Sequence, residues 1–280
     1  MKKIGVIGAG TMGAGIIQVF AQGGHEVAYT DTFPGAVEKG FALIEKNLGK
    51  LVDKEKITAE EKDAVLGRIK GGPDLSVVQD ADLIVEAVYE NLEVKKELFS
   101  ELDKLTGPDT ILASNTSAFS ITEIANATKR PEKVIGMHFF NPAPVMKLVE
   151  VIRGLKTADE TEATVTEIAS AIGKTPVKAV EGPGFVVNRI LIPMINEGIG
   201  VYADGIASAE DVDEAMKLGA NHPIGPLALG DLVGLDVCLA IMETLYTEFG
   251  DTKYRPHPLL RKMVRGGKLG RKTGEGFFKY

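Results

Sequence analysis

Cysteine and closely spaced metal ligands are scarce in this sequence, and their scarcity excludes several classes of protein. The single cysteine, Cys238, cannot form an internal disulfide, and we expect it to pack as a small apolar residue. The four histidines, His25, His138, His222 and His257, have no ligand-like spacing to one another or to Cys238, so no metal site is predicted. No apolar run is as long as a membrane span.

Basic residues are fewer than acidic residues in this chain. The chain has 32 Lys and Arg against 39 Asp and Glu, a net charge of -7. Binding to nucleic acid in general, or to an anionic membrane, requires a basic surface, so neither partner is predicted. Its 280 residues, 44% hydrophobic and 25% charged, are ordinary for a globular protein and suffice for two domains with cores of their own. We expect a soluble, cytoplasmic enzyme.

The N-terminal residues have the pattern of a dinucleotide-binding unit: an apolar strand, a glycine turn, a helix, a second strand and an acid. Gly8 permits the tight turn, Gly10 lets the backbone approach a pyrophosphate, and Gly13 lets helix and strand pack closely. Asp31 ends the second strand, where it is expected to accept hydrogen bonds from ribose hydroxyls and to repel a 2′-phosphate. NAD is therefore favoured over NADP.

The same residues could also be read as a secretory signal peptide. Lys2 and Lys3 precede an apolar stretch, and Ala21 could mark a cleavage site. The regularly spaced glycines and the strand that follows them fit a cleaved segment poorly, so we favour the dinucleotide site.

A second pattern, around His138 and Glu150, predicts a general base with its orienting carboxylate. Residues 134–139 and 148–152 are strand-like, and two prolines between them favour a turn. If the chain doubles back about Pro144, the two side chains lie directly opposite each other in an antiparallel pair. A carboxylate would then fix the tautomer of the imidazole and stabilise its protonated form. The alternative is a structural histidine and a solvated glutamate.

Apolar runs alternate with helical segments up to about residue 180, and from there on only helical patterns occur. Such alternation predicts a parallel sheet with helices on both faces. The expected fold class is α/β, with a Rossmann-type, doubly wound, mostly parallel sheet over residues 1–182 followed by an all-helical domain over residues 183–280. Expected strands include 81–88 and 110–114, and expected helices include 34–50, 91–105, 188–203, 209–218, 227–246 and 258–265.

Several motifs together give the chain a resemblance that runs nearly from end to end. They are Gly8 to Gly13, Glu90 to Lys95, Ala113 to Ser117, His138 to Pro142, Pro183 to Arg189 and Lys272 to Phe277. The chain resembles the 3-hydroxyacyl-CoA dehydrogenase family, of the bacterial 3-hydroxybutyryl-CoA dehydrogenase type. It departs from the family at Ala118 and Phe119, where a small polar or aliphatic pair is more usual, which affects the expected shape of the acyl pocket.

The resemblance implies interconversion of (S)-3-hydroxyacyl-CoA and 3-oxoacyl-CoA, with 3-hydroxybutyryl-CoA and acetoacetyl-CoA as the expected pair. His138 would exchange the proton of the 3-hydroxyl group, and Glu150 would offset the charge that it gains. Ser117 and Asn188, the latter from the helical domain across the cleft, would donate hydrogen bonds to the substrate. On residue patterns alone, both are read as helix-capping residues. The NAD-binding residues that the resemblance implies are Gly8, Gly10, Thr11, Met12, Gly13, Asp31, Glu90, Lys95, Ser117, Asn141 and Lys272.

Coenzyme A carries phosphates, so a net-negative chain must gather positive charge locally to bind it. Lys46, Lys50 and Lys54 recur every four residues and share one face if the helix that begins near residue 34 extends that far. Lys56 adds to this group. A solvated lysine face is the usual interpretation, but the family's use of this region favours CoA contacts, with Lys50 and Lys54 the main candidates.

Two other functions stay open on the sequence. A crystallin-like protein could keep the fold without turnover, and a gulonate-type sugar-acid dehydrogenase would keep the same catalytic residues without needing a lysine face. The family also suggests a homodimer formed through the helical domain.

Overall fold

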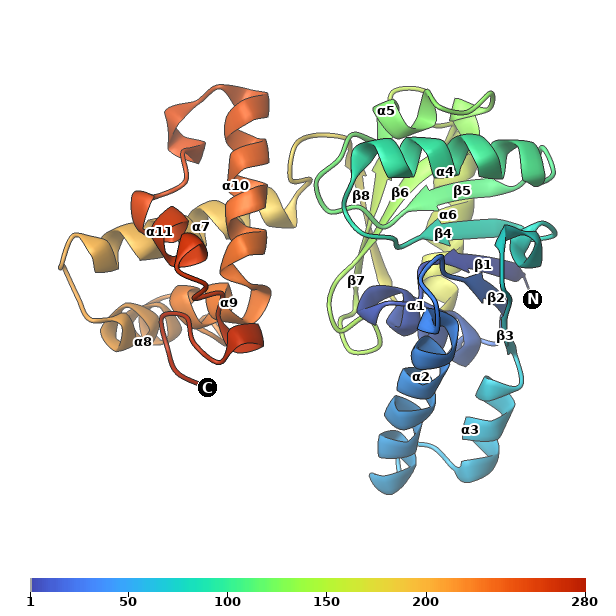
Figure 1. The fold of residues 1–280 in the computed structure, drawn as a ribbon, viewed down its shortest axis with the longest axis horizontal. Coiled ribbons are helices and arrows are strands. Elements are labelled where there is room, and N and C mark those ends of the chain that lie inside the picture. Colours follow the sequence, from blue (N-terminus) through green and yellow to red (C-terminus); the bar gives the residue numbers. More distant parts are fainter. Residues whose placement is uncertain (1) are drawn as a thin grey trace. The chain divides into compact units, whose positions relative to one another are not determined.

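The computed structural model describes residues 2–280, which divide into two compact units. The first unit ends at Gly182 and contains the sheet, and the second unit, Pro183–Tyr280, is built from helices (Figure 1). The predicted fold class, a mostly parallel α/β sheet followed by helices, is thus confirmed. Within residues 2–280, no helix is both long enough and apolar enough to cross a membrane.

Within residues 2–280, eight strands form one sheet in the order β3-β2-β1-β4-β5-β6-β7-β8. All neighbouring strands run parallel except β6 and β7, which are antiparallel. The strand order changes direction between β1 and β4, and ligands of such sheets bind beside the carboxyl ends of the strands at this point. The strands are β1 (Lys3–Ile7), β2 (Glu26–Thr30), β3 (Ile69–Gly71), β4 (Leu83–Glu86), β5 (Ile111–Ser114), β6 (Val134–Phe139), β7 (Leu148–Arg153) and β8 (Thr175–Val180).

Helices cover both faces of this sheet. Ile16 of α1 and Val165 of α6 lie in one apolar core with alternate strand residues such as Val6 and Met137. Helix α4 lies over the opposite face, in front of the sheet in Figure 1, where it buries Phe99 completely. The helices of the first unit are α1 (Thr11–Gln22), α2 (Ala36–Asp53), α3 (Ala59–Leu66), α4 (Leu92–Leu105), α5 (Ile121–Ala125) and α6 (Asp159–Ala171).

The second unit has an apolar core of its own, to which Ile195, Leu227, Cys238 and Leu245 belong. Residues 227–246, expected as one helix, form parts of two, because Gly234 between them has φ +102°. This backbone conformation suits glycine and ends a helix. The helices are α7 (Val187–Ala203), α8 (Ala209–Gly219), α9 (Pro226–Val233), α10 (Leu235–Phe249) and α11 (Pro258–Arg265).

Two boundaries in the first unit also differ from the expected ones. The helix expected from residue 34 begins at Ala36, because Gly35 before it has a left-handed backbone with φ +73°. The strand expected over 81–88 is limited to Leu83–Glu86, since the chain beyond it turns toward the start of α4. Asn91 caps that helix by accepting a hydrogen bond from the backbone N–H of Val94 at 3.1 Å.

Candidate active site

The predicted site residues of the sheet unit, apart from the lysines proposed to bind CoA, gather at one edge of the sheet. The glycine turn follows β1, Asp31 follows β2, Glu90 follows β4 and Ser117 follows β5. These strands are parallel, so all four segments lie at their carboxyl ends. This is the edge at which doubly wound sheets bind their ligands.

The glycine turn has the geometry of a dinucleotide-binding loop. Gly8 has φ +102°, and a Cβ atom on Gly13 would lie 1.9 Å from the carbonyl oxygen of Gly8. Backbone conformation therefore accounts for Gly8, and packing accounts for Gly13. A Cβ atom on Gly10, at the N-terminus of α1, would meet nothing within 4 Å, so packing does not require glycine there. The bare backbone of Gly10 fits the close approach of a pyrophosphate to the helix N-terminus.

Asp31 is joined to this turn through its carboxylate. Oδ2 accepts a hydrogen bond from the backbone N–H of Ala9 at 2.7 Å, and Oδ1 accepts one from Phe33 at 2.8 Å. A carboxylate oxygen has more than one lone pair, so the same group can accept further bonds from ribose hydroxyls. The residues present therefore fit the adenosine half of NAD. Thr11 and Met12 lie in the first turn of α1 beside Gly10.

His138 and Glu150 lie directly opposite each other in the antiparallel pair of β6 and β7, as predicted. Nδ1 of His138 is 2.8 Å from Oε2 of Glu150. The glutamate is 0% exposed and the histidine 5%, so the alternative of a solvated glutamate is wrong. Because Met137 and Phe139 belong to the core on the α1 face, strand alternation directs His138 to the α4 face. Its ring also packs against Phe140, with centroids 4.5 Å apart.

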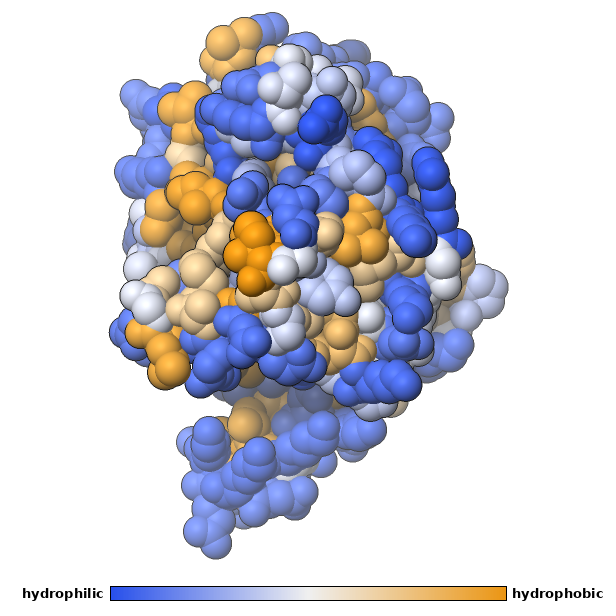
Figure 2. Space-filling model, turned by 90° about the vertical axis from the view of Figure 1, so that its left-hand side faces the viewer, coloured by the Kyte–Doolittle hydropathy of each residue, from blue (hydrophilic) through white to orange (hydrophobic). Residues whose placement is uncertain are grey.

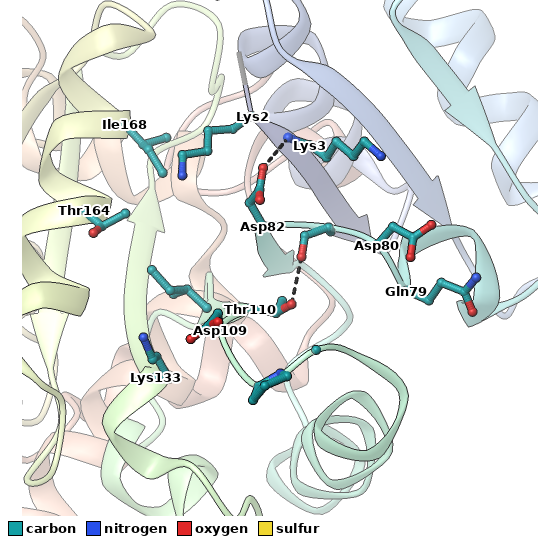
Figure 3. Close-up of a pocket in the computed structure, with 14 residues that line it drawn as sticks. Lys2, Lys3, Gln79, Asp80, Asp82, Asp109, Thr110, Lys133, Thr164 and Ile168 are labelled. Atoms are coloured by element: carbon teal, nitrogen blue, oxygen red, sulfur yellow. Dashed lines mark hydrogen bonds between the residues drawn. The ribbon is translucent and has the colours of Figure 1, made fainter.

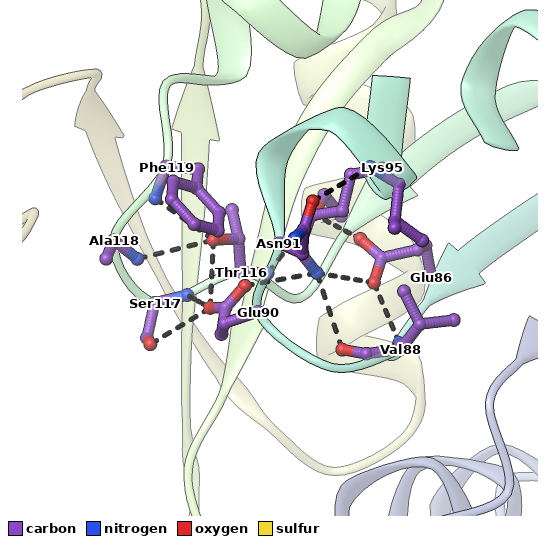
Figure 4. A network of polar contacts seen from close by, with 11 residues as sticks. Glu86, Val88, Glu90, Asn91, Lys95, Thr116, Ser117, Ala118 and Phe119 are labelled. Atoms are coloured by element: carbon purple, nitrogen blue, oxygen red, sulfur yellow. Dashed lines mark hydrogen bonds and ion pairs between the residues drawn. The ribbon is translucent and has the colours of Figure 1, made fainter. Parts of the chain in front are cut away.

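Glu90, Lys95 and Ser117 are joined in a polar network at the ends of β4 and β5 (Figure 4). Oε1 of Glu90 accepts hydrogen bonds from the backbone N–H of Ser117 at 2.7 Å and from its hydroxyl at 3.2 Å. A lysine at the start of a helix is usually solvated, but Lys95 is only 1% exposed and its charge is paired with Glu86 and Glu90. The capping interpretation of Ser117 is also wrong, since Ser120 caps α5.

Two members of this network, Glu86 and Ser114, were missed in the sequence. Glu86 is 0% exposed, bonds Lys95 at 2.6 Å, and accepts a hydrogen bond from the Ser114 hydroxyl at 2.6 Å. The available signal was a glutamate at the end of an otherwise apolar strand, because a carboxylate is rarely buried without a partner.

Asn141 lies in the turn that follows β6, close in sequence to His138. Lys174, before β8, holds this turn, because its Nζ donates hydrogen bonds to the carbonyl oxygens of Ala143 at 2.6 Å and Met146 at 2.8 Å. Burial lowers the pKa of Lys174. Helix α1 packs against the same turn at Gly15, where a Cβ atom would lie 3.1 Å from that of Ala143.

Two predicted site residues belong to the helical unit. Asn188 is a buried residue in the first turn of α7, one residue after the helix begins. Lys272 lies near the C-terminus, where its Nζ donates a hydrogen bond to Oδ2 of Asp236 at 2.6 Å. The contacts of both residues with NAD or substrate therefore stay predictions.

The four predicted CoA lysines are all exposed. Lys46 and Lys50 lie one turn apart on α2, but this helix ends at Asp53, so Lys54 lies at its C-cap and Lys56 beyond it. The predicted shared face thus holds for Lys46 and Lys50 and reaches Lys54 only at the end of the helix, while Lys56, expected to add to the group, lies outside the helix. The chain turns back here, with φ +54° at Glu55.

A hollow of about 570 Å³ lies at the opposite edge of the sheet (Figure 3). It is lined by residues at the amino ends of the strands, including Lys3, Asp82 and Thr110. The backbone N–H of Lys3 donates to Asp82 Oδ2 at 2.8 Å, and Thr110 donates to the Ala81 carbonyl, also at 2.8 Å. These polar groups satisfy one another, and the hollow is separate from the residues described above.

Comparison with known proteins identifies relatives over the whole chain. Residues 3–182 match the NAD binding domain of 3-hydroxyacyl-CoA dehydrogenase, and residues 184–280 match its C-terminal domain. A 3-hydroxybutyryl-CoA dehydrogenase from Clostridioides difficile is 60% identical over 99% of both chains. The mitochondrial hydroxyacyl-coenzyme A dehydrogenase of Homo sapiens is 46% identical over all of this chain and 91% of its own.

Solved structures agree with these relatives. The crystal structure of (S)-3-hydroxybutyryl-CoA dehydrogenase from Ralstonia eutropha is similar with a TM-score of 0.97 and 51% identity, covering 100% of this chain and 99% of that one. Both family domains and the full-length similarity lead to the same assignment. The chain belongs to the 3-hydroxyacyl-CoA dehydrogenase family, and its first unit is the NAD-binding domain of that family.

Proposed function

We propose that this protein interconverts (S)-3-hydroxybutyryl-CoA and acetoacetyl-CoA with NAD as the redox partner. The proposal depends above all on the buried pair of His138 and Glu150, which lie 2.8 Å apart on the neighbouring strands β6 and β7. A relative named 3-hydroxybutyryl-CoA dehydrogenase at 60% identity supports this choice of substrate, as do two named probable 3-hydroxybutyryl-CoA dehydrogenase at 55% and 52% identity.

His138 is the proposed general base. Because Nδ1 faces Glu150, Nε2 is the atom that takes the proton of the substrate's 3-hydroxyl group. Glu150 holds the ring in one orientation and offsets the positive charge that it gains. Bound NAD would supply the acceptor for the hydride that leaves C3. In the reverse direction the imidazolium returns its proton to the carbonyl oxygen.

Ser117 is the proposed donor to the reacting oxygen. Its backbone N–H is held by Glu90 at 2.7 Å, which fixes the start of the loop after β5. The single proton of the Ser117 hydroxyl is donated to Glu90 at 3.2 Å, and with substrate bound the hydroxyl would turn to donate to the carbonyl oxygen instead. A neutral hydroxyl polarises a carbonyl without transferring a proton to it. We propose Asn188 as a further donor to the substrate, and Lys50 and Lys54 as contacts for the CoA phosphates.

The direct test is NADH oxidation with acetoacetyl-CoA, compared with free acetoacetate and with dehydrogulonate. The proposal expects turnover with the thioester and a much lower kcat/KM with both free acids. Preference for dehydrogulonate would indicate a sugar-acid dehydrogenase instead. A protein that binds NADH without turning over any of the three would be a crystallin-like relative.

We also propose a homodimer formed through the helical unit. Ile190, Ile206 and Leu218 expose 68%, 72% and 78% of their surface, which is unusual for large apolar side chains. Figure 2 shows apolar side chains lying beside one another on a face of this unit. Sedimentation equilibrium should give twice the mass of one chain. A single-chain mass at micromolar concentration would contradict the dimer.

A further inference from the structure

Glu86 is a buried carboxylate for which the mechanism above has no role. It ends β4, on the sheet face covered by α4, and is 0% exposed. Its Oε1 atom accepts hydrogen bonds from Lys95 Nζ at 2.6 Å and from the backbone N–H of Val88 at 2.8 Å. Its Oε2 atom accepts one from the Ser114 hydroxyl at 2.6 Å. Both oxygens are thus engaged, and the negative charge is matched by one ammonium group.

The same ammonium group also binds a second carboxylate. Lys95 Nζ lies 3.1 Å from Oε2 of Glu90, whose side chain is 40% exposed. Lys95 therefore joins a carboxylate that is fixed in the sheet to one that lies in the loop after β4. Two carboxylates share one ammonium group. The negative charge of Glu86 therefore determines how strongly Lys95 attracts Glu90.

Glu90 in turn holds the loop after β5 through its other oxygen. Oε1 accepts hydrogen bonds from Thr116 Oγ1 at 3.0 Å, from Ser117 N–H at 2.7 Å and from the Ser117 hydroxyl at 3.2 Å. Figure 4 shows the series of contacts from Glu86 through Lys95 and Glu90 to Ser117. The series begins inside the sheet and ends at the proposed substrate donor.

A contribution to stability alone is a poor explanation for such a pair. The cost of desolvating a buried carboxylate and ammonium offsets most of their attraction, and apolar residues of similar volume often replace such pairs without loss. Apolar residues would not hold an ammonium group at a fixed point. In this pair the ammonium is fixed, and from there it can orient a second carboxylate.

We propose that Glu86 is a positioning residue for Ser117, acting through Lys95 and Glu90. It holds Lys95 where the ammonium keeps Glu90 turned toward the Ser117 N–H and hydroxyl. This inference rests on the proposed function only for the role of Ser117 toward substrate, since the series of contacts is independent of which reaction is catalysed.

Glu86→Gln is the first test, because glutamine keeps the volume and can still bond Ser114 and Val88. Lys95 then has Glu90 as its charged partner in this network and draws that carboxylate away from Ser117. Hydrogen exchange in the segment 115–119 should become several-fold faster. Glu162→Gln is the matched control: Glu162 is also buried, in α6, and pairs with Arg153 and Lys178, both at 2.9 Å.

Unchanged exchange over 115–119 in Glu86→Gln, or the same increase in Glu162→Gln, would overturn the proposal. If Glu86→Gln does not fold, the double variant Glu86→Gln with Lys95→Met removes both charges and avoids an unmatched ammonium. It also releases Glu90, so it should show the same faster exchange, and normal exchange in this variant would count against the proposal.

A double-mutant cycle with Ser117→Ala then separates positioning from a general structural effect. Glu86→Gln should lower kcat with acetoacetyl-CoA about tenfold, the effect of one lost neutral hydrogen bond. In the Ser117→Ala background it should lower kcat little further, because the group it positions is gone. Losses that multiply would overturn the proposal. A wild type that is inactive toward acetoacetyl-CoA would contradict the proposed function, while the exchange result would still decide the link between Glu86 and Ser117.

Discussion

Oε2 of Glu150 lies 2.8 Å from Nδ1 of His138, and the two residues face each other across β6 and β7 with less than a tenth of either exposed. A hydrogen bond that spans two paired strands is rigid, because the ladder fixes both backbones. The imidazole therefore has one orientation and one favoured tautomer.

Glu150→Gln should lower kcat roughly 10- to 100-fold, the cost of one charge-assisted hydrogen bond to a neighbouring cation in the transition state. The Kd for NADH should change little, because the carboxylate faces His138. Stopped-flow kinetics and fluorescence titration of NADH measure the two quantities. Glu162→Gln, a buried carboxylate paired elsewhere in the same unit, is the control and should retain wild-type kcat. Equal losses in both variants would mean that the Glu150 effect is not specific.

The position of Asp31 predicts a preference for NADH over NADPH, because its carboxylate at the end of β2 repels a 2′-phosphate. Replacing Asp31 with serine and Thr32 with arginine should narrow that preference. Asp31 also accepts the Ala9 N–H at 2.7 Å, so the variant should bind NADH more weakly as well. Values of kcat/KM for both cofactors provide the measurement. Equal constants in the wild type would contradict a ribose contact by Asp31.

Lys50→Glu combined with Lys54→Glu should raise the KM for acetoacetyl-CoA about tenfold, because two exposed attractions become repulsions. That KM should also become less sensitive to salt. Turnover at saturation should change far less, because these contacts are remote from the reacting carbon.

Two controls distinguish the loss of a CoA contact from a general effect of the changed net charge on KM. Lys104→Glu with Lys129→Glu makes the same change in charge at exposed positions next to the opposite edge of the sheet, and should leave KM unaltered. An acetoacetyl thioester of a short thiol lacks the nucleotide and should be insensitive to all four substitutions. If full acetoacetyl-CoA were equally insensitive to Lys50→Glu and Lys54→Glu, CoA would bind elsewhere.

Cys238 predicts a loss of stability at high pH. Burial raises its pKa from 9.0 to about 12, so the native thiol stays protonated where the unfolded thiol ionises. Ionisation therefore favours the unfolded state, and the contribution of Cys238 to stability is complete below pH 9 and is lost as pH rises from 9 toward 12. The slope is about 1.4 kcal/mol per pH unit within that range.

Comparison of wild type and Cys238→Ala by urea unfolding between pH 8 and 10.5 measures this difference. The wild type should lose more free energy of unfolding with rising pH than the variant does. A thiol reagent at pH 8 should also react with Cys238 only after urea unfolds the helical unit, because the residue is 0% exposed. Rapid reaction of the native protein would contradict this account.

Local signals predicted the parts of the site that are close in sequence or set by a strand ladder. The glycine turn and the pairing of His138 with Glu150 are of this kind, because a tight turn and the twofold period of a strand fix both geometries. Glu86 and Ser114 are far apart in the chain and meet only because β4 and β5 are neighbours in the sheet. Their network, and the burial of Lys95 within it, could not be predicted without that strand order.

The lysine group shows that a local pattern can also mislead. Spacing of four residues predicted one helical face, but spacing does not reveal where a helix stops. Helix α2 ends at Asp53 with Lys54 as its C-cap, and the chain turns at Glu55, which places Lys56 beyond the helix that carries Lys46 and Lys50. Similarly, Gly234 divides residues 227–246 into two helices, a break that the apolar pattern alone did not indicate.

The central claim is that His138 transfers the proton while Glu150 supports it. The most direct measurement is the single-turnover rate of NADH oxidation by acetoacetyl-CoA for wild type and His138→Ala, with NADH binding measured in parallel. We predict that the rate falls by about two to four orders of magnitude, the range for a lost general acid or base, while the Kd for NADH stays within about twofold. A His138→Ala variant whose single-turnover rate is close to that of the wild type would contradict this account.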